Sequence, residues 1–281
     1  GIPMQMYEAG EIDAAYVSLG DIDRVRDITN ALNRELTVVP ELSFQYLGFN
    51  AQAPPFDDPL VRQAFSLAVN KDKIVNTLLN GTAEKAEGIL PPGLPGFNPN
   101  LKRLGYDPTR AQELLRASRY SGRLPAITLT ISGDGTPDYI AAIIQNWQQT
   151  LGAQVTVRQV DPETYFYRLK EEKDQVFLTG WIADYPDPQN FLDILFYSQS
   201  EENFGDYRNA EIDSLLEKAR SLPLGQARFE LYQQIEQKLT DEAAVLPLWF
   251  GKNYLLVKPY VKDYTVSPLG IPMLREVSLE P

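Results

Sequence analysis

The chain has 281 residues, and its 38 acidic residues against 26 basic ones give a formal net charge of −12 at pH 7. This length is enough for one large hydrophobic core or two ordinary ones, so we expect two lobes. The negative charge opposes binding to nucleic acid or anionic membranes, because proteins bind these through clustered basic residues. The chain contains no cysteine and no histidine, which excludes disulfides, thiol nucleophiles, His-based general bases and Cys/His zinc sites.

Short strands and one helix are predicted before residue 51. Residues 11–17 form a short apolar run typical of a buried strand, and residues 21–32 carry apolar side chains at helical spacing. Residues 36–40 and 42–50 are then predicted to form two further strands.

Two helices with recognisable ends come next. Asp57 or Asp58 can cap a helix whose first turn contains Pro59, a position that suits proline because its missing N–H would be unpaired there anyway. A second, short helix is expected to begin at a cap formed by Asp72 and to end at Gly81.

A loop separates these helices from a region of strand and helix alternation. Residues 88–105 are rich in proline and glycine, which predicts a long ordered surface loop. Strands are predicted at 126–131, 153–160 and 175–180, with a helix stopped by Gly152 between the first two. This alternation indicates α/β layering with crossover connections. The other predicted elements are helices opened by Asp107-Pro108, by Asp161-Pro162 and by Asn209, a helix at 225–240, strands at 243–250 and 253–258, and a loop and tail over the last twenty residues.

The stretch GWIADYPDPQNFLDILF, residues 180–196, lies between a predicted strand and the next predicted helix. The carboxyl end of a strand in an open α/β sheet is where ligands bind. Trp181 offers an apolar face and Asp184 a negative charge three residues later, while Pro186 and Pro188 restrict the turn. This chemistry suits a ligand that is cationic at one end and apolar beside it.

Other interpretations of the same residues remain open. Trp181 suits a hydrophobic core equally well. Asp184 and Asp187 can form the turn or cap the following helix. A calcium site through Asp184, Asp187 and Asp193 matches no EF-hand spacing. A glycosidase that uses Asp184 and Asp187 as paired carboxylates has no other support in the sequence.

Several segments together resemble a known family. PPFDDPLVRQAFSLAVNKDKIVNTLLNG, YDPTRAQELL, GWIADYPDPQNFLDILF and YRNAEIDSLLEKAR are similar, in this order, to segments of the extracellular solute-binding proteins of family 5, the dipeptide- and oligopeptide-binding receptors of ABC importers. The resemblance implies an α/β fold, a type II periplasmic binding protein lobe with a mixed sheet flanked by helices.

The resemblance also implies a division of the chain between two lobes. Residues 44–247 correspond to the carboxy-proximal, solute-binding lobe. Residues 1–43 correspond to a remnant of the N-terminal lobe with the hinge, and residues 248–281 to a return segment of that lobe. We expect the larger, earlier part of the N-terminal lobe, the leader peptide and a lipid-anchor cysteine to belong to a longer protein.

In peptide-binding members a Trp-x-x-Asp at this position pairs its carboxylate with the α-ammonium group of the peptide, which the resemblance carries over to Trp181 and Asp184. Tyr185 beside them is included in the expected ligand-binding set. Some oligopeptide receptors have an arginine shortly before the Gly-Trp pair that helps to neutralise the peptide's carboxyl end, whereas Leu178 and Thr179 stand here. The handling of that carboxylate is therefore left open.

Three further residues are weaker candidates. Tyr46 and Asn50 are expected where the chain crosses between lobes, at the hinge or the cleft, unless they only pack within a strand. Trp249 is expected near the return crossing, where it can line the cleft or join the core.

The sequence thus predicts a monomeric, non-enzymatic receptor without metal or cofactor. It would capture small peptides between two lobes and present them to an ABC permease, in the periplasm or at the cell surface. The alternatives are an oligosaccharide receptor of the same family, with Trp181 stacked on a sugar ring, and a carboxylate-dependent hydrolase.

Overall fold

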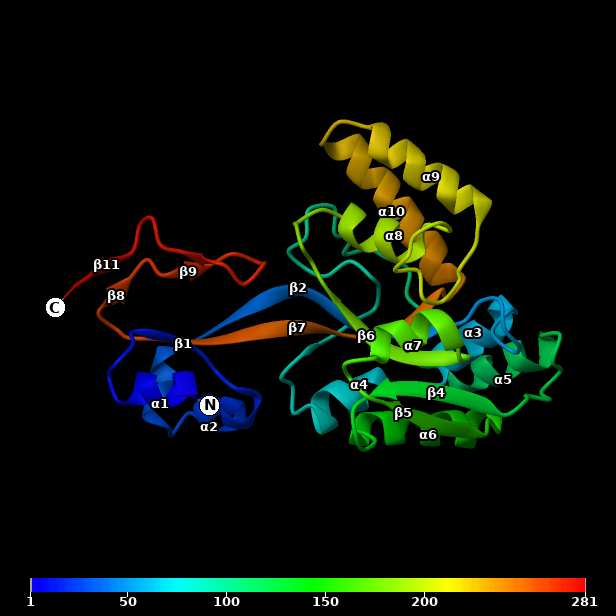
Figure 1. Cartoon of the computed structure of the whole chain (residues 1–281), viewed down its shortest axis with the longest axis horizontal. Helices are drawn as coiled ribbons and strands as arrows, with labels where there is room; N and C mark the ends of the chain where they lie inside the picture. The colour runs from blue at the N-terminus through cyan, green and yellow to red at the C-terminus, as the bar shows by residue number, and fades with distance from the viewer. Residues whose placement is uncertain (1, 281) are drawn as a thin grey trace.

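The computed structural model describes residues 2–280, which form a larger and a smaller body joined by two long strands (Figure 1). The helices are α1 (Ile2–Glu8), α2 (Ile22–Arg26), α3 (Pro59–Leu67), α4 (Lys71–Lys73), α5 (Pro108–Ala117), α6 (Asp138–Leu151), α7 (Tyr165–Glu172), α8 (Gln189–Phe196), α9 (Ala210–Ser221) and α10 (Gln226–Asp241). The strands are β1 (Ala14–Tyr16), β2 (Leu36–Phe49), β3 (Glu84–Lys85), β4 (Ile127–Ser132), β5 (Val155–Val160), β6 (Val176–Ile182), β7 (Val245–Val257), β8 (Val261–Lys262), β9 (Thr265–Val266), β10 (Pro272–Met273) and β11 (Ser278–Leu279).

A mixed seven-stranded sheet runs through the larger body, and its edge strand β1 lies in the smaller body. Its strand order is β1-β7-β2-β6-β4-β5, and β3 pairs with β7 off this path. β4 runs parallel to β5 and β6, whereas β2 runs antiparallel to β6 and β7. One hydrophobic cluster packs the sheet against α7, α8, α9 and α10, and a second packs it against α3, α5 and α6. The expected α/β layering with a mixed sheet between helices is confirmed.

The smaller body is reached through β2 and β7, the blue and orange strands that bridge the two bodies in Figure 1. The register between these strands shifts between Pro40 and Phe44 and again between Gln45 and Tyr46. The smaller body has a hydrophobic cluster of its own, formed around Met4, Tyr7 and Leu256. The predicted boundaries at 43/44 and 247/248 fall inside the two bridging strands, and the assignment of the smaller body to another lobe stays a prediction.

Some predicted helix ends are corrected by local side-chain hydrogen bonds. The helix expected at 21–32 ends at Arg26, because the Asp27 carboxylate accepts hydrogen bonds from the Thr29 backbone N–H at 2.8 Å and from its hydroxyl at 2.7 Å. The cap of α4 is Asn70, whose side chain accepts from the Lys73 N–H, and not the predicted Asp72.

Other predicted elements are longer, shorter or later than expected. The strands predicted at 36–40 and 42–50 form the single strand β2, and those at 243–250 and 253–258 form β7. The helix opened by Asp161-Pro162 begins only at Tyr165. The last twenty residues contain the short paired strands β9, β10 and β11 in addition to loops.

The predicted loop at 88–105 contains no helix or strand and is fastened to α10. One carboxylate oxygen of Glu236 accepts hydrogen bonds from the N–H groups of Ile89 and Leu90, at 2.9 and 2.8 Å. The side chain of Gln237 pairs with both the N–H and the carbonyl of Lys102. A cavity of about 290 Å³ lies between this loop, β3 and Glu236.

Glu236 is expected to make stability depend on pH. Burial raises the pKa of Glu236 to about 7, although its two backbone hydrogen bonds act in the opposite direction. The folded state therefore holds this proton more tightly than the unfolded chain does. The resulting contribution of Glu236 to the free energy of unfolding is fully present below pH 4.5 and is lost as the pH rises through about 7.

The variant Glu236→Gln keeps the hydrogen-bond acceptor but cannot ionise. Between pH 4.5 and 7 the free energy of unfolding of the wild type should fall by about 3 kcal/mol relative to this variant. Urea denaturation across this pH range measures the difference. Parallel pH profiles for the two proteins would contradict the prediction.

Candidate functional site

A hollow of about 300 Å³ opens where β2, β6 and β7 lie side by side. Its wall combines aromatic rings, small residues and a few polar groups, and none of its residues is basic. The lining residues are Glu41, Ser43, Phe44, Gln45, Gly180, Trp181, Ile182, Trp249 and Gly251. The only charge in this wall is therefore negative, and it is carried by Glu41.

Two glycines keep the hollow open. A Cβ built on Gly180 would lie 2.6 Å from a side-chain oxygen of Gln45, and one built on Gly251 would lie 2.3 Å from a carboxylate oxygen of Glu41. Larger residues at either position would displace the polar side chains that form the wall. The sequence therefore keeps backbone surface accessible at the floor of the hollow.

Asp184 follows β6 by two residues and is exposed to solvent. Its backbone N–H donates to the side-chain oxygen of Asn190 at 3.0 Å, and its carboxylate accepts a hydrogen bond from the side-chain nitrogen of Asn190 at 3.2 Å. Across residues 2–280 its carboxylate takes part in no ion pair. Asp184 thus presents an exposed carboxylate without an ion-pair partner among residues 2–280, two residues after Ile182 in the wall of the hollow.

The neighbouring carboxylates differ from Asp184 because arginines hold them. Asp187 receives two hydrogen bonds from the guanidinium of Arg228, at 2.6 and 2.9 Å, and also accepts from the Gln189 N–H at the start of α8. Asp193 is buried and pairs with Arg220. Asp187 therefore has the turn-forming role that the sequence left open. Each of these acids thus pairs with an arginine, and residues 2–280 contain no group of three or more acidic side chains placed to hold a metal ion.

The predicted site residues separate into two groups. Trp181 and Trp249 both line the hollow, and Trp249 packs edge to face against Tyr139 on α6 with ring centres 4.9 Å apart. Tyr185 is exposed next to Asp184, and its hydroxyl donates to the Gln189 side chain at 3.1 Å. Trp181 and Trp249 thus lie in the wall of the hollow, and Asp184 and Tyr185 follow the wall residue Ile182 in the chain.

Tyr46 and Asn50 lie elsewhere. Tyr46 is 3% exposed and stacks on Phe44 in the core beneath the helices, with ring centres 4.6 Å apart. Asn50 is buried just after the carboxyl end of β2, and its side chain donates to the Lys173 carbonyl at 2.9 Å. We therefore assign packing and loop-fixing contacts to these two residues and do not include them in the proposed site.

Asn190 is a site residue that sequence reasoning missed. It lies on α8, is completely buried, and its oxygen also accepts a hydrogen bond from the Trp181 indole N–H at 3.0 Å. The available signal was weak: Asn190 follows another amide, Gln189, and precedes the apolar pair Phe191 and Leu192. Only the fold brings this amide under both Trp181 and Asp184.

The chain matches the family described as bacterial extracellular solute-binding proteins, family 5 Middle, over residues 2–203. This match covers well over half of the chain. The chain belongs to this family.

Two curated relatives in Escherichia coli (strain K12) are similar to the family 5 chain along most of its length. The probable deoxycholate-binding periplasmic protein YgiS is 32% identical over 265 residues, covering 92% of this chain and 49% of the relative. The dipeptide-binding protein is 30% identical over 272 residues, covering 94% of this chain and 50% of the relative. The chain thus spans about half the length of these relatives.

A solved structure confirms the fold expected for family 5. MppA, a periplasmic murein tripeptide binding protein in its unliganded open form, superposes with a TM-score of 0.87 and 25% identity, covering 99% of this chain and 55% of that one. The fold is that of a type II periplasmic binding protein. Both curated relatives carry periplasmic or peptide-binding names, and within residues 2–280 no helix has the length and apolar character needed to cross a bilayer.

Proposed function

We propose that the protein containing this chain is the solute-binding component of an ABC import system. It encloses a small peptide between two lobes and delivers it to a membrane permease. It performs no catalysis and works as a monomer in the periplasm or at the cell surface, anchored by a lipid in its full-length form. The ligand-binding set in this half is Trp181, Asp184, Tyr185 and Trp249.

The observation that carries this proposal is the state of Asp184. Its carboxylate is exposed and pairs with no cation among residues 2–280, whereas Asp187, three residues later in the chain, is held by Arg228. An ammonium group enclosed against such a carboxylate as the lobes close would form a desolvated charge pair with hydrogen bonds. Closure then acts as a population shift toward the ligand-bound, shut state.

The hollow favours the amino end of a peptide over its carboxyl end. Glu41 adds a second negative charge, and the wall contains no lysine or arginine. Leu178, at the position where some oligopeptide receptors have an arginine, supplies no charge either. We therefore place the peptide's amino terminus in this half and assign its carboxylate to groups outside the hollow.

The same charges weigh against other solutes of the family. A bile acid such as the one in the name of YgiS is an anion, which Glu41 and Asp184 would repel. An oligosaccharide could stack on Trp181 and offer hydroxyls to Asp184, but it would leave the carboxylate without a cation. A peptide with a free amino terminus can contact the ring and also neutralise the charge of the carboxylate.

Calorimetry on the full-length protein tests the proposal. Peptides of two to five residues with a free amino terminus are expected to bind at least tenfold more tightly than the same peptides carrying an N-acetyl group. The acetyl group removes the positive charge and leaves the side chains unchanged. Equal affinity for both series would remove the Asp184 charge pair, and the peptide hypothesis with it.

A further inference from the structure

Asn190 occupies an unusual environment for an amide. It is completely buried on α8, where its neighbours along the helix, Phe191 and Leu192, belong to the hydrophobic cluster under the sheet. A buried polar group is costly unless its hydrogen bonds are made. All the hydrogen bonds of this side chain run to two residues, Trp181 and Asp184.

The orientation of the amide follows from its partners. The Trp181 indole N–H and the Asp184 backbone N–H are both donors, and the nitrogen of each lies 3.0 Å from the amide oxygen. The amide nitrogen then faces the Asp184 carboxylate at 3.2 Å. A rotated amide would set donor against donor in two places, so one orientation is imposed by chemistry.

We propose that Asn190 is a positioning residue that sets the receptor's selectivity for a free amino terminus. It fixes the Asp184 carboxylate and the Trp181 ring relative to each other before the ligand arrives. This inference rests on the proposed function, because the carboxylate is taken to receive an ammonium group.

Two features make this arrangement effective. The amide donates to one oxygen of Asp184, which leaves the other oxygen available to the ligand. It is also neutral, so it orients the carboxylate without supplying the positive charge that Arg228 supplies to Asp187. A preorganised acceptor lowers the ordering cost of binding and keeps its charge for the incoming cation.

The test compares Asn190→Leu with Asn203→Leu in the full-length protein. Asn203 is also buried, at 8% exposure, and its side chain likewise makes three hydrogen bonds, to Tyr197 and Tyr207, away from Asp184. Both variants should lose stability. The measured quantity is the ratio of affinities for a free dipeptide and its N-acetyl form, which a merely structural defect would leave unchanged.

We expect Asn190→Leu to lower this ratio about tenfold and Asn203→Leu to keep the wild-type ratio. If Asn190→Leu does not fold, Asn190→Ser replaces it, because a serine hydroxyl is too short to reach both Trp181 and Asp184. A wild-type ratio in a folded Asn190 variant would overturn the proposal. A wild-type protein that fails to distinguish the two peptides would instead overturn the proposed function, so the two failures can be told apart.

Discussion

Asp184→Asn is expected to abolish the preference for peptides with a free amino terminus. The substitution keeps the size of the side chain and its contact with Asn190, but it removes the charge that pairs with the ligand's ammonium group. Loss of one partner from an enclosed charge pair costs about 2–5 kcal/mol, or roughly 30- to several-thousand-fold in Kd. N-acetylated peptides should bind the variant and the wild type with similar affinity.

Two control variants make this result specific. Glu113→Gln removes an acid on α5, at the far end of the larger body, whose ion pair is with Arg110 on the same helix; it should change neither affinity nor selectivity. Asp187→Asn breaks the pair with Arg228 at the start of α8 and should lower the melting temperature while selectivity is retained. Calorimetry on the full-length variants gives both readouts. An Asp184→Asn protein that still prefers free amino termini would refute the charge-pair mechanism.

Helix ends that depend on one nearby side chain could be predicted from the sequence. Asp58 caps α3, Asp107 caps α5 and Asn209 caps α9 through hydrogen bonds to N–H groups two or three residues on. Gly152 ends α6 with a φ of 68°, a left-handed conformation that glycine adopts without strain. These signals are local, and they lie within four residues of the feature that they determine.

Features that depend on distant partners could not be predicted. The irregularity between Pro40 and Phe44 does not divide β2 into two strands, because β7 pairs with β2 on both sides of it. The apolar spacing at 21–32 suggested a longer helix, but Ile28 is 88% exposed since the turn at Asp27 ends the helix first. Periodicity indicates which side chains suit burial and does not show whether a partner surface exists.

The candidate site shows the same division. The Trp-x-x-Asp motif, Trp181 to Asp184, could be found in the sequence, and family resemblance gave it a role. Whether Asp184 or Asp187 remains free depended on Arg228, which lies 41 residues beyond Asp187 and reaches it only in the fold. The buried amide of Asn190 was likewise invisible until α8 packed beneath β6.

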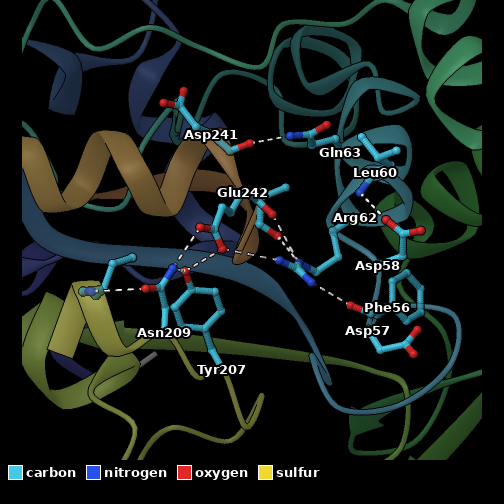
Figure 2. A network of polar contacts seen from close by, with 12 residues as sticks. Phe56, Asp57, Asp58, Leu60, Arg62, Gln63, Tyr207, Asn209, Asp241 and Glu242 are labelled. Atoms are coloured by element: carbon cyan, nitrogen blue, oxygen red, sulfur yellow. Dashed lines mark hydrogen bonds and ion pairs between the residues drawn. The ribbon is translucent and has the colours of Figure 1, made fainter. Parts of the chain in front are cut away.

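A second large effect is expected from Arg62→Met, which should lower the free energy of unfolding by about 3–5 kcal/mol. Figure 2 shows the Arg62 guanidinium between α3 and the end of α10. It is 4% exposed and donates to the carbonyls of Phe56 at 2.8 Å and of Glu242 and Ala243 at 3.2 Å each. Ala243 has a φ of 46°, so the chain turns out of the helix there. The carbonyls at this turn have no helical N–H partner, and the arginine supplies their donors.

Gln63→Met is the matched control, since Gln63 follows Arg62 on α3 and donates to the Asp241 carbonyl at 2.6 Å in the same region of α10 (Figure 2). That carbonyl can bond to water when the glutamine is removed, because the contact is exposed, so the loss should stay below about 1 kcal/mol. Methionine in place of Arg62 instead removes the donor from three carbonyls, two of them in buried contacts and the third in a part-buried one. Urea denaturation of both variants at neutral pH measures the difference in midpoint. Equal losses of unfolding free energy in the two variants would show that the carbonyls around Arg62 are as accessible to water as the Asp241 carbonyl. Arg62 would then not hold the junction of α10 and β7 together.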